Sequence, residues 1–389
     1  MAEAKSTSSM ERNYSAFDVE LTHQALNIRM FIRLLGWMKP YRKTLFVSIG
    51  LVVMGAIAAV MLPVVTGRVI IDSILLPSTT AESLPDYGMI GLMESIRNLL
   101  QTQPLVAAGI LYVLLTVAQS VLMFGHQLTL ASSALKSLRD LRMDLFASLE
   151  SKPASFYDNV AVGRVMTRVS NDVESLFGLL TGFGMLAGEF VPFFIALFLM
   201  IHISPDLTGV VALALPLAGI GTYIFRRLMS RIFRLIRDSV SSLNQYMQED
   251  LSGIEVVQLS SREPTNMQQY RELNQNNRLQ ENRAINYEVL YENFNNSLAS
   301  IAIAGIIWYG GGHVVQNEIS LGAMVLFTNL VHMMIQPVVA LGQQFNVLFR
   351  SMASGERIFQ ALDWDEKLHE PDEPVNLPDR LRGQIEFRN

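Results

Sequence analysis

FGLLTGFGMLAGEFVPFFIALFLMI, at residues 177–201, is an apolar run with a single charged residue, Glu189. About 20 apolar residues are enough for a helix to cross about 30 Å of hydrocarbon. An ionised carboxylate costs about 2.5–3.5 kcal/mol at the centre of such a helix. The fourteen Leu, Ile, Val and Phe residues of the run contribute roughly −0.3 to −0.6 kcal/mol each. Their sum outweighs the carboxylate, so the run predicts a membrane-spanning helix.

Five further apolar windows of similar length lie on either side of this run, at residues 44–66, 104–125, 207–225, 297–315 and 321–341. Half of the 389 residues are hydrophobic and only 17% are charged, whereas soluble domains carry about 25% charged residues. The sequence therefore predicts an all-α membrane protein with six transmembrane helices.

The distribution of basic residues predicts the orientation of these helices. Of 30 Lys and Arg residues, only Arg68 and Arg97 fall in segments that the six spans place on the far side from the termini. Cytoplasmic loops of membrane proteins are enriched in Lys and Arg. We therefore expect both termini and the two long loops, 125–177 and 225–297, in the cytosol, and the protein in the plasma or inner membrane.

Both long loops carry a helical pattern. Residues 128–149 and 232–257 place apolar side chains three and four positions apart among charged ones. Antiparallel helical arms of this length would extend about 30–45 Å beyond the membrane. Residues 26–39 alternate apolar and basic side chains, which favours an elbow helix lying in the membrane interface. Residues 1–25 are polar and without period, which predicts a disordered tail.

The first arm turns at Pro153-Ala154-Ser155-Phe156-Tyr157-Asp158. Two large aromatic residues at a tip, among polar groups, have the composition of a docking hot spot. Beyond the turn, Arg164, Arg168 and Asp172 follow at four-residue spacing, so they fall on one helix face and could pair along it. A solvated row of weak ion pairs is the alternative interpretation.

The second arm turns in the polar cluster Ser260-Ser261-Arg262-Glu263-Pro264, after Leu251-Ser252-Gly253-Ile254-Glu255-Val256-Val257. Taken together, the sequence from about residue 26 onward resembles the transmembrane domain of an ABC exporter, of the bacterial multidrug and lipid type. Three segments carry the resemblance: the run 251–257, the run Ser354-Gly355-Glu356-Arg357-Ile358-Phe359, and the first-loop residues Phe156, Tyr157, Asp158, Gly163, Arg164, Arg168, Asn171, Asp172, Val173 and Glu174.

The resemblance implies a type 1 exporter transmembrane domain over residues 26–352. It implies that the tips near residues 156–159 and 260–267 are coupling helices seated on nucleotide-binding domains. The residues expected to transmit this coupling are Phe156, Tyr157, Asp158, Arg164, Arg168, Asp172, Ser261, Arg262 and Glu263. It also implies a second transmembrane half, in a homodimer or heterodimer, and alternating-access export of an amphipathic drug or lipid.

The last residues, Arg382-Gly383-Gln384-Ile385-Glu386-Phe387-Arg388-Asn389, resemble the first strand of the family's nucleotide-binding domain. Residues 353–389 are therefore expected to be a linker and this first strand. The 389 residues contain no GxxxxGK[ST] phosphate-binding loop. We expect this chain to bind no cofactor and hydrolyse no ATP by itself, with ATP and Mg²⁺ held by the nucleotide-binding domain. Only the complete transporter would be an ATP-hydrolysing enzyme.

Polar side chains within the apolar windows are the candidates for contact with substrate. Asn329, His332 and Gln336 share one face of the sixth window, and Met333 is adjacent. The resemblance implies that this window lines the translocation cavity, although hydrogen bonding between helices is an alternative. Glu189 is as consistent with a buried, helix-paired carboxyl as with a substrate contact. No spacing of His, Asp or Glu predicts a metal site, and the sequence has no cysteine.

Three other functions fit less well. A secondary transporter has no use for long cytosolic arms, and neither has a membrane scaffold without ATP coupling. A voltage-sensing channel needs an arginine ladder inside a span, whereas Arg227, Arg231, Arg234 and Arg237 follow the fourth window. The net charge of −5 argues against a nucleic-acid partner. The sequence leaves open the identity of the substrate and of the second half.

Overall fold

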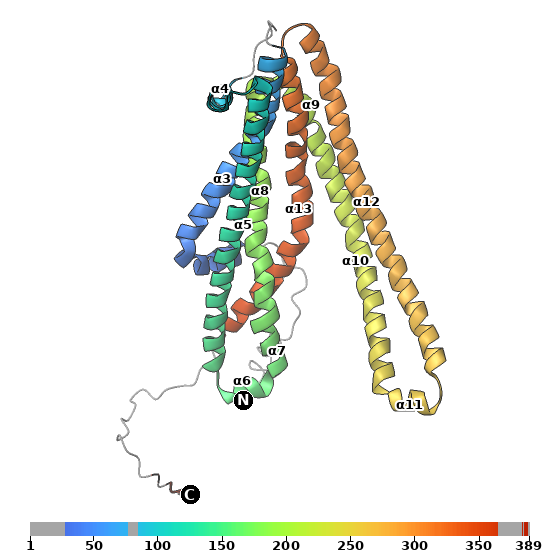
Figure 1. Ribbon diagram of the computed structural model, residues 1–389. Helices are drawn as coiled ribbons and strands as arrows, with labels where there is room; N and C mark the ends of the chain where they lie inside the picture. Colours follow the sequence, from blue (N-terminus) through green and yellow to red (C-terminus); the bar gives the residue numbers. More distant parts are fainter. Residues whose placement is uncertain (1–27, 77–84, 365–382, 384, 388–389) are drawn as a thin grey trace, which may run out of the picture. The chain divides into compact units, whose positions relative to one another are not determined.

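The computed structural model describes residues 28–76, 85–364, 383 and 385–387, so the predicted tail and most of the C-terminal segment lie outside it. The described elements are all helical (Figure 1). Six helical segments are long and apolar enough to cross a membrane, which confirms the six predicted spans. Of the predicted terminal strand, residues 383 and 385–387 are described, and they form no strand.

The amino-terminal described segment is helical but changes type twice. Helix α2 (Ile28–Leu34) passes into the 3₁₀-helix η1 (Leu35–Tyr41), and then into α3 (Arg42–Val64). Pro40 lies inside η1, where it cannot donate a backbone hydrogen bond. The first span does not end near Thr66, because the π-helix η2 (Val65–Leu75) continues it.

Helix α4 (Met89–Leu100) is separate from the next span. Gln101 ends it with φ 49°, a left-handed backbone conformation that a helix cannot continue through. Helix α5 (Pro104–Glu150) then runs for 47 residues, about 70 Å at 1.5 Å per residue. Because this exceeds the roughly 30 Å of a bilayer core, α5 holds both the second span and the first limb of the first arm, as the sequence predicted.

The first arm ends in a short helix. Pro153 is extended and precedes α6 (Ala154–Asn159), which is followed by α7 (Val162–Thr167). The chain returns through the π-helix η3 (Arg168–Asp172) into α8 (Val173–Ile203). A π-turn inserts one residue into the helix, which changes the register of the row, although Arg168 still lies near both Arg164 and Asp172.

The fourth span is divided. Helix α9 (Pro205–Ala212) ends one residue before α10 (Ala214–Ser252). Pro216 explains the break, because it has no N–H for the carbonyl of Ala212. Gly253 ends α10, and the short helix α11 (Ile254–Leu259) follows. The sequence placed the second tip helix near residues 260–267. It lies earlier, because Ser261 adopts φ 51° and turns the chain into α12.

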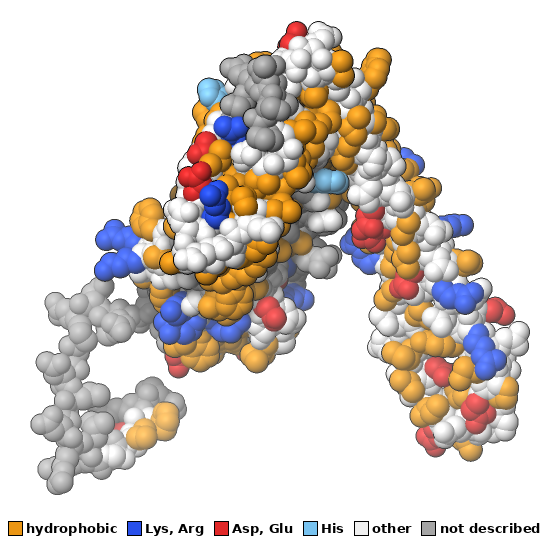
Figure 2. Space-filling model, turned by 45° about the horizontal axis from the view of Figure 1, so that its top comes forward, with side chains coloured by type: hydrophobic (Ala, Val, Ile, Leu, Met, Phe, Trp, Pro, Cys, Tyr) orange, Lys and Arg blue, Asp and Glu red, His pale blue; other side chains and the backbone are white. Residues whose placement is uncertain are grey.

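Helix α12 (Glu263–Val315) runs for 53 residues and packs antiparallel to α10, with α11 closing the end of the hairpin (Figure 1). Acidic and basic side chains are spread over that end of the hairpin, as Figure 2 shows. Helix α13 (Leu321–Leu362) completes the fold and includes the sixth span.

The chain divides into two compact units. The described residues of the first fall within 28–41, 134–179 and 349–387, and those of the second within 42–133 and 180–348. The second unit has the main apolar core, to which the spans contribute Val64, Leu111, Met200, Ile306 and Leu330. Because lipid tails are as apolar as these side chains, close packing between the helices, and not removal from water, stabilises such a core in a bilayer.

Within the second unit, Asp72 joins the end of η2 to the start of α13. Its carboxylate accepts hydrogen bonds from Ser320 Oγ at 2.7 Å and from the backbone N–H of Gly322 at 2.9 Å. Asp72 is 6% exposed. It therefore caps the amino terminus of α13 from a distant part of the sequence.

Candidate coupling tips and substrate pocket

Phe156 and Tyr157 in α6 have different environments. The Phe156 ring is fully buried and packs edge-on against Tyr157 and Trp364, at centroid distances of 5.1 and 5.9 Å. Tyr157 is exposed, and its hydroxyl donates to the Leu149 carbonyl at 2.7 Å. The prediction that both rings face a partner needs correction: Phe156 packs within its own chain, and Tyr157 and Asp158 form the exposed surface of this tip.

The row of charges after α6 also divides. Arg164 is exposed, whereas Arg168 is 3% exposed and donates to the carbonyl of Arg357 at 3.0 Å. Asp172 accepts from Arg357 Nε at 2.9 Å and from Ser354 Oγ at 2.9 Å. The hydrogen-bonded ionic partner of Asp172 is therefore Arg357, in the Ser354–Phe359 segment. Arg168, four residues before Asp172, also interacts with it electrostatically, as the spacing predicted.

The elbow joins the same unit. Arg33 forms an ion pair with Asp363, and its guanidinium lies 4.5 Å from the centre of the Phe359 ring. The hydrogen bond from Arg33 holds the pKa of Asp363 below its ordinary value. Lys152 donates to the carbonyl of Trp364. The chain after the last span is thus held against both the elbow and the first arm.

The second tip exposes apolar side chains. Val256 is 67% and Leu259 81% exposed in α11, and Ile254 beside them is 39% exposed. Ser261 and Arg262 lie in the following turn, and Glu263 begins α12. The residues predicted for coupling at this tip were those of the polar turn, and the apolar surface of α11 was not among them. The spacing of Ile254, Val256 and Leu259 at i, i+2 and i+5 could have indicated it.

A pocket of about 280 Å³ lies between α10, α12 and α13 in the second unit. Two of the residues predicted for a substrate cavity, His332 and Gln336, line it, together with Phe225, Glu288, Tyr291, Glu292, Asn295 and Gln343. Asn329 is exposed one turn away, and its amide donates to the Val325 carbonyl at 2.8 Å. Met333 packs against the core. Glu189, which is half-buried in α8, does not line the pocket.

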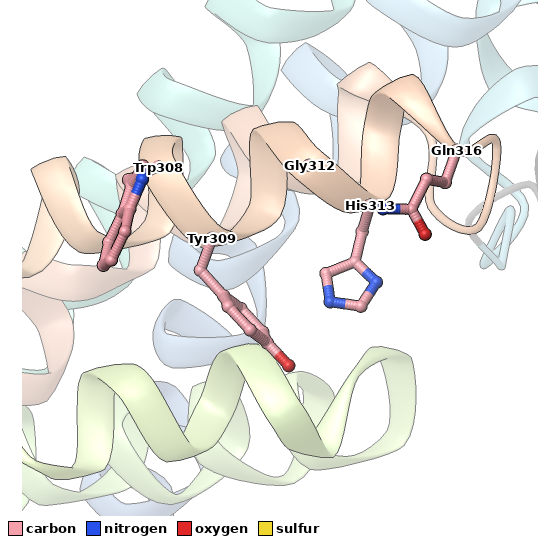
Figure 3. A pocket seen from close by; sticks show the side chains of 5 residues that line it. All are labelled: Trp308, Tyr309, Gly312, His313 and Gln316. Carbon is pink, nitrogen blue, oxygen red and sulfur yellow. The ribbon is translucent and has the colours of Figure 1, made fainter.

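A second, shallower pocket of about 240 Å³ lies at the other end of α12, where Trp308, Tyr309, Gly312, His313 and Gln316 line it (Figure 3). His313 pairs with Glu318, and its ring stands edge-on to Tyr309 at 4.7 Å. Trp308 is 87% exposed. Exposed aromatic residues near the end of a span are typical of the membrane–water interface, so this surface indicates a boundary and not a substrate site.

Among the described residues, no group of three or more His, Cys, Asp or Glu side chains could hold a metal ion. The pocket between α10, α12 and α13 itself is lined by acidic, polar, aromatic and aliphatic side chains.

Comparison with known proteins identifies the family. The family described as the ABC transporter transmembrane region matches residues 45–338. The chain belongs to this family. The match confirms the predicted ABC exporter transmembrane domain and shows a multi-pass membrane protein.

Three relatives illustrate the range of this family. The chain is 28% identical, over its whole length, to the uncharacterised ABC transporter ATP-binding protein YknV of Bacillus subtilis (strain 168), of which the match covers 60%. It is 27% identical to a probable multidrug resistance ABC transporter ATP-binding/permease protein, YheH, of the same organism, over 68% of this chain and 40% of that protein. An ATP-dependent lipid A-core flippase of Syntrophus aciditrophicus (strain SB) is 26% identical, over 64% of this chain and 42% of the flippase.

The chain thus spans 40–60% of the length of these ABC transporter relatives. Two of these relatives are named as ATP-binding proteins and the third as ATP-dependent, while the family matched by residues 45–338 of this chain is the transmembrane region.

Proposed function

We propose that this chain is the membrane-spanning half of an ATP-driven exporter that moves an amphipathic drug or lipid out of the cytosol by alternating access. The observation that carries the proposal is the end of the α10–α12 hairpin, where Val256 and Leu259 are largely exposed. Exposed apolar clusters on soluble surfaces mark interaction sites. The occupant that we propose is a groove on a nucleotide-binding domain, since relatives are named as ATP-binding/permease proteins.

In this proposal α6 and α11 are the two coupling helices. At the first tip, Tyr157, Asp158 and Arg164 contact a nucleotide-binding domain. Arg168 and Asp172 transmit the motion through Arg357, and Phe156 anchors the tip internally. At the second tip, Ser261, Arg262 and Glu263 form a polar rim around the apolar surface of α11. Such a centre-and-rim composition suits a protein interface.

ATP and Mg²⁺ are bound, in this proposal, by two nucleotide-binding domains that close on each other. A second transmembrane half, identical or different, completes the substrate path. The basic loops predict that both arms lie in the cytosol, which is where ATP is available. The pocket lined by His332 and Gln336 receives the substrate from the cytosol or inner leaflet.

The test uses the full-length protein in inside-out membrane vesicles. ATP should drive accumulation of a fluorescent amphiphile, and Val256→Ser with Leu259→Ser should abolish most of that transport while ATP turnover and membrane insertion persist. Leu279→Ser, at a 48% exposed residue in the return limb of the same arm, is the matched control. Wild-type transport by the double variant would contradict docking at α11.

A secondary transporter or a scaffold without ATP coupling gives different results in the same vesicles. Uptake that follows a proton gradient and ignores ATP would favour the secondary transporter. No uptake under either condition would favour the scaffold.

A further inference from the structure

The pocket between α10, α12 and α13 has a strong bias of charge. Glu288 and Glu292 lie four residues apart on α12 and both line it, and no Lys or Arg is among its described lining residues. Like charges at this spacing repel each other on a helix. Within the described part of the chain, neither carboxylate forms an ion pair with a basic side chain. A bound cation would relieve the repulsion.

The wall beside these carboxylates is aromatic. Tyr291 stacks on Phe225 with ring centroids 4.1 Å apart and an angle of 12° between the planes. The Tyr291 hydroxyl shares a hydrogen bond of 2.8 Å with Thr222 Oγ1, which fixes the ring. Aromatic faces attract organic cations, and the attraction is strongest where water is excluded.

Helix α13 comes close to this aromatic wall at Gly342. A Cβ atom there would lie 2.8 Å from Thr222 Cγ2 and 3.6 Å from the Tyr291 hydroxyl. The first distance is too short for a side chain, so helix α13 packs tightly against Thr222, the residue whose hydroxyl holds the Tyr291 ring. A preformed pocket avoids part of the ordering cost of binding.

Asn295 gives the observation that points to a particular ligand. It lines the pocket and is 7% exposed. Its amide nitrogen donates to the Tyr291 carbonyl at 2.9 Å, but among the described residues its Oδ1 has no hydrogen-bond donor. A buried acceptor without a donor is costly. A ligand that carries an N–H group can supply that donor.

The remaining lining is apolar. Ala299, Ile335 and Val339 lie beside the polar groups. A volume of about 280 Å³ is at the lower end of what drug-sized ligands need. The pocket therefore suits the head of an amphiphile and the first part of its apolar body, while the rest of a long ligand extends outward.

We propose that this pocket selects cationic amphiphiles by binding a protonated amine, with Glu288 and Glu292 supplying the charge and Asn295 accepting an N–H hydrogen bond. This inference rests on the proposed export function, whose substrate class it narrows. An anionic lipid headgroup would meet two carboxylates, so it is the ligand that the pocket should exclude.

The experiment measures equilibrium binding, without ATP, to the full-length protein in nanodiscs. The probes are four fluorescent amphiphiles with one apolar body: a tertiary amine, its quaternary ammonium analogue, a neutral amide and a phosphate monoester. The tertiary amine should bind about tenfold more tightly than the neutral probe, and the phosphate should bind most weakly. Glu288→Gln with Glu292→Gln should remove this preference, whereas Glu281→Gln, on the same helix outside the pocket, should preserve it.

Asn295 is tested by the difference between the amines. Asn295→Leu should weaken binding of the tertiary amine. It should leave binding of the quaternary analogue unchanged, because that probe has no N–H group. Size-exclusion profiles and thermal transitions check that each variant folds. Equal binding of all four probes by the wild-type protein, or an unchanged preference in the folded double glutamine variant, would overturn the inference.

The proposed function is judged separately. If wild-type vesicles transport the neutral probe with ATP but show no preference for the amine, the selection of cations by the pocket is contradicted and the proposed export function is supported. Wild-type vesicles that bind the amine but transport none of the four probes with ATP would support the pocket and contradict export.

Discussion

Asp172 and Arg357 lie 185 residues apart in sequence, yet the Arg357 Nε donates to Asp172 Oδ2 at 2.9 Å. The pair is partly buried, with the Asp172 side chain 13% exposed. Ser354 Oγ donates to the other carboxylate oxygen at 2.9 Å. The contact therefore fixes the segment after the last span to the start of α8.

We expect Arg357→Met to lower the midpoint temperature of thermal unfolding of the purified protein. Hydrogen bonds to charged groups are worth about 1.5–3 kcal/mol each, and this substitution removes them and leaves Asp172 without its ionic partner. Differential scanning fluorimetry in detergent measures the change. Arg271→Met, at an exposed residue of α12, is the control and should leave the transition unchanged. An equal effect of the two substitutions would argue against a stabilising pair.

Substitutions of Phe156 and Tyr157 should have different effects: the first should lower the stability of the protein, and the second should impair the coupling of ATP turnover to transport. Phe156→Ala removes a fully buried ring and should cost about 3–5 kcal/mol, seen as a large drop in the thermal transition. Tyr157→Phe removes one hydrogen bond, to the Leu149 carbonyl, at about 0.5–1.5 kcal/mol. Tyr157→Ala should uncouple ATP turnover from transport in vesicles. If Phe156→Ala kept its thermal transition and lost coupling, the ring would be a docking element after all.

The spans and arms were predictable because their signals are local. A run such as residues 177–201 exceeds the thickness of a bilayer whatever surrounds it, and the apolar spacing in 128–149 and 232–257 specifies helix within a few turns. The positions at which helices break were harder to predict from the sequence. Gly253 ends α10 and the following α11 is transverse, but the sequence around it reads equally well as one continuous helix.

Contacts between distant segments could not be predicted from spacing. Asp172 has an arginine, Arg168, four residues before it in the sequence, and the two interact electrostatically. The hydrogen bonds to its carboxylate come from Arg357, which is 185 residues away and which no local spacing could indicate. The predicted pocket residues His332 and Gln336 were found from polarity inside an apolar window. Glu288 and Glu292 were missed, because a charged pair on a polar helix is usually only a solvated surface. Both residues are indeed exposed, and only the packing of α13 shows that they also line a pocket.

The pair between Arg33 and Asp363 predicts a dependence of stability on pH. The hydrogen bond from Arg33 lowers the pKa of Asp363 in the folded protein, while the unfolded chain keeps an ordinary value of about 3.9. A depressed pKa contributes stability that is present above the ordinary value and is lost as pH falls through the folded value. The contribution is small, since both side chains are about half exposed.

Thermal transitions of the wild-type protein and Asp363→Asn, measured between about pH 3 and pH 8, test this dependence. The difference between the two proteins should be constant from neutral pH down to about pH 5 and should shrink below about pH 4. A difference that grew toward acid pH would show that the carboxylate is not stabilised by Arg33.

The last prediction concerns the contact of Asp72 with the start of α13. A Cβ atom on Gly322 would collide with the carbonyl of Gly67 and with the Asp72 carboxylate. Gly322→Ala should therefore cost about 1–3 kcal/mol by overpacking, and Asp72→Ala about 0.5–2 kcal/mol by loss of the cap. Gly311→Ala is the control, because nothing lies within 4 Å of the added atom and alanine favours helix over glycine by about 0.5–1 kcal/mol. The midpoint temperature of thermal unfolding should fall for Gly322→Ala and Asp72→Ala, and it should hold or rise for Gly311→Ala. If Gly311→Ala lowered the midpoint as much as Gly322→Ala, the start of helix α13 would not depend on close packing against Gly67 and Asp72.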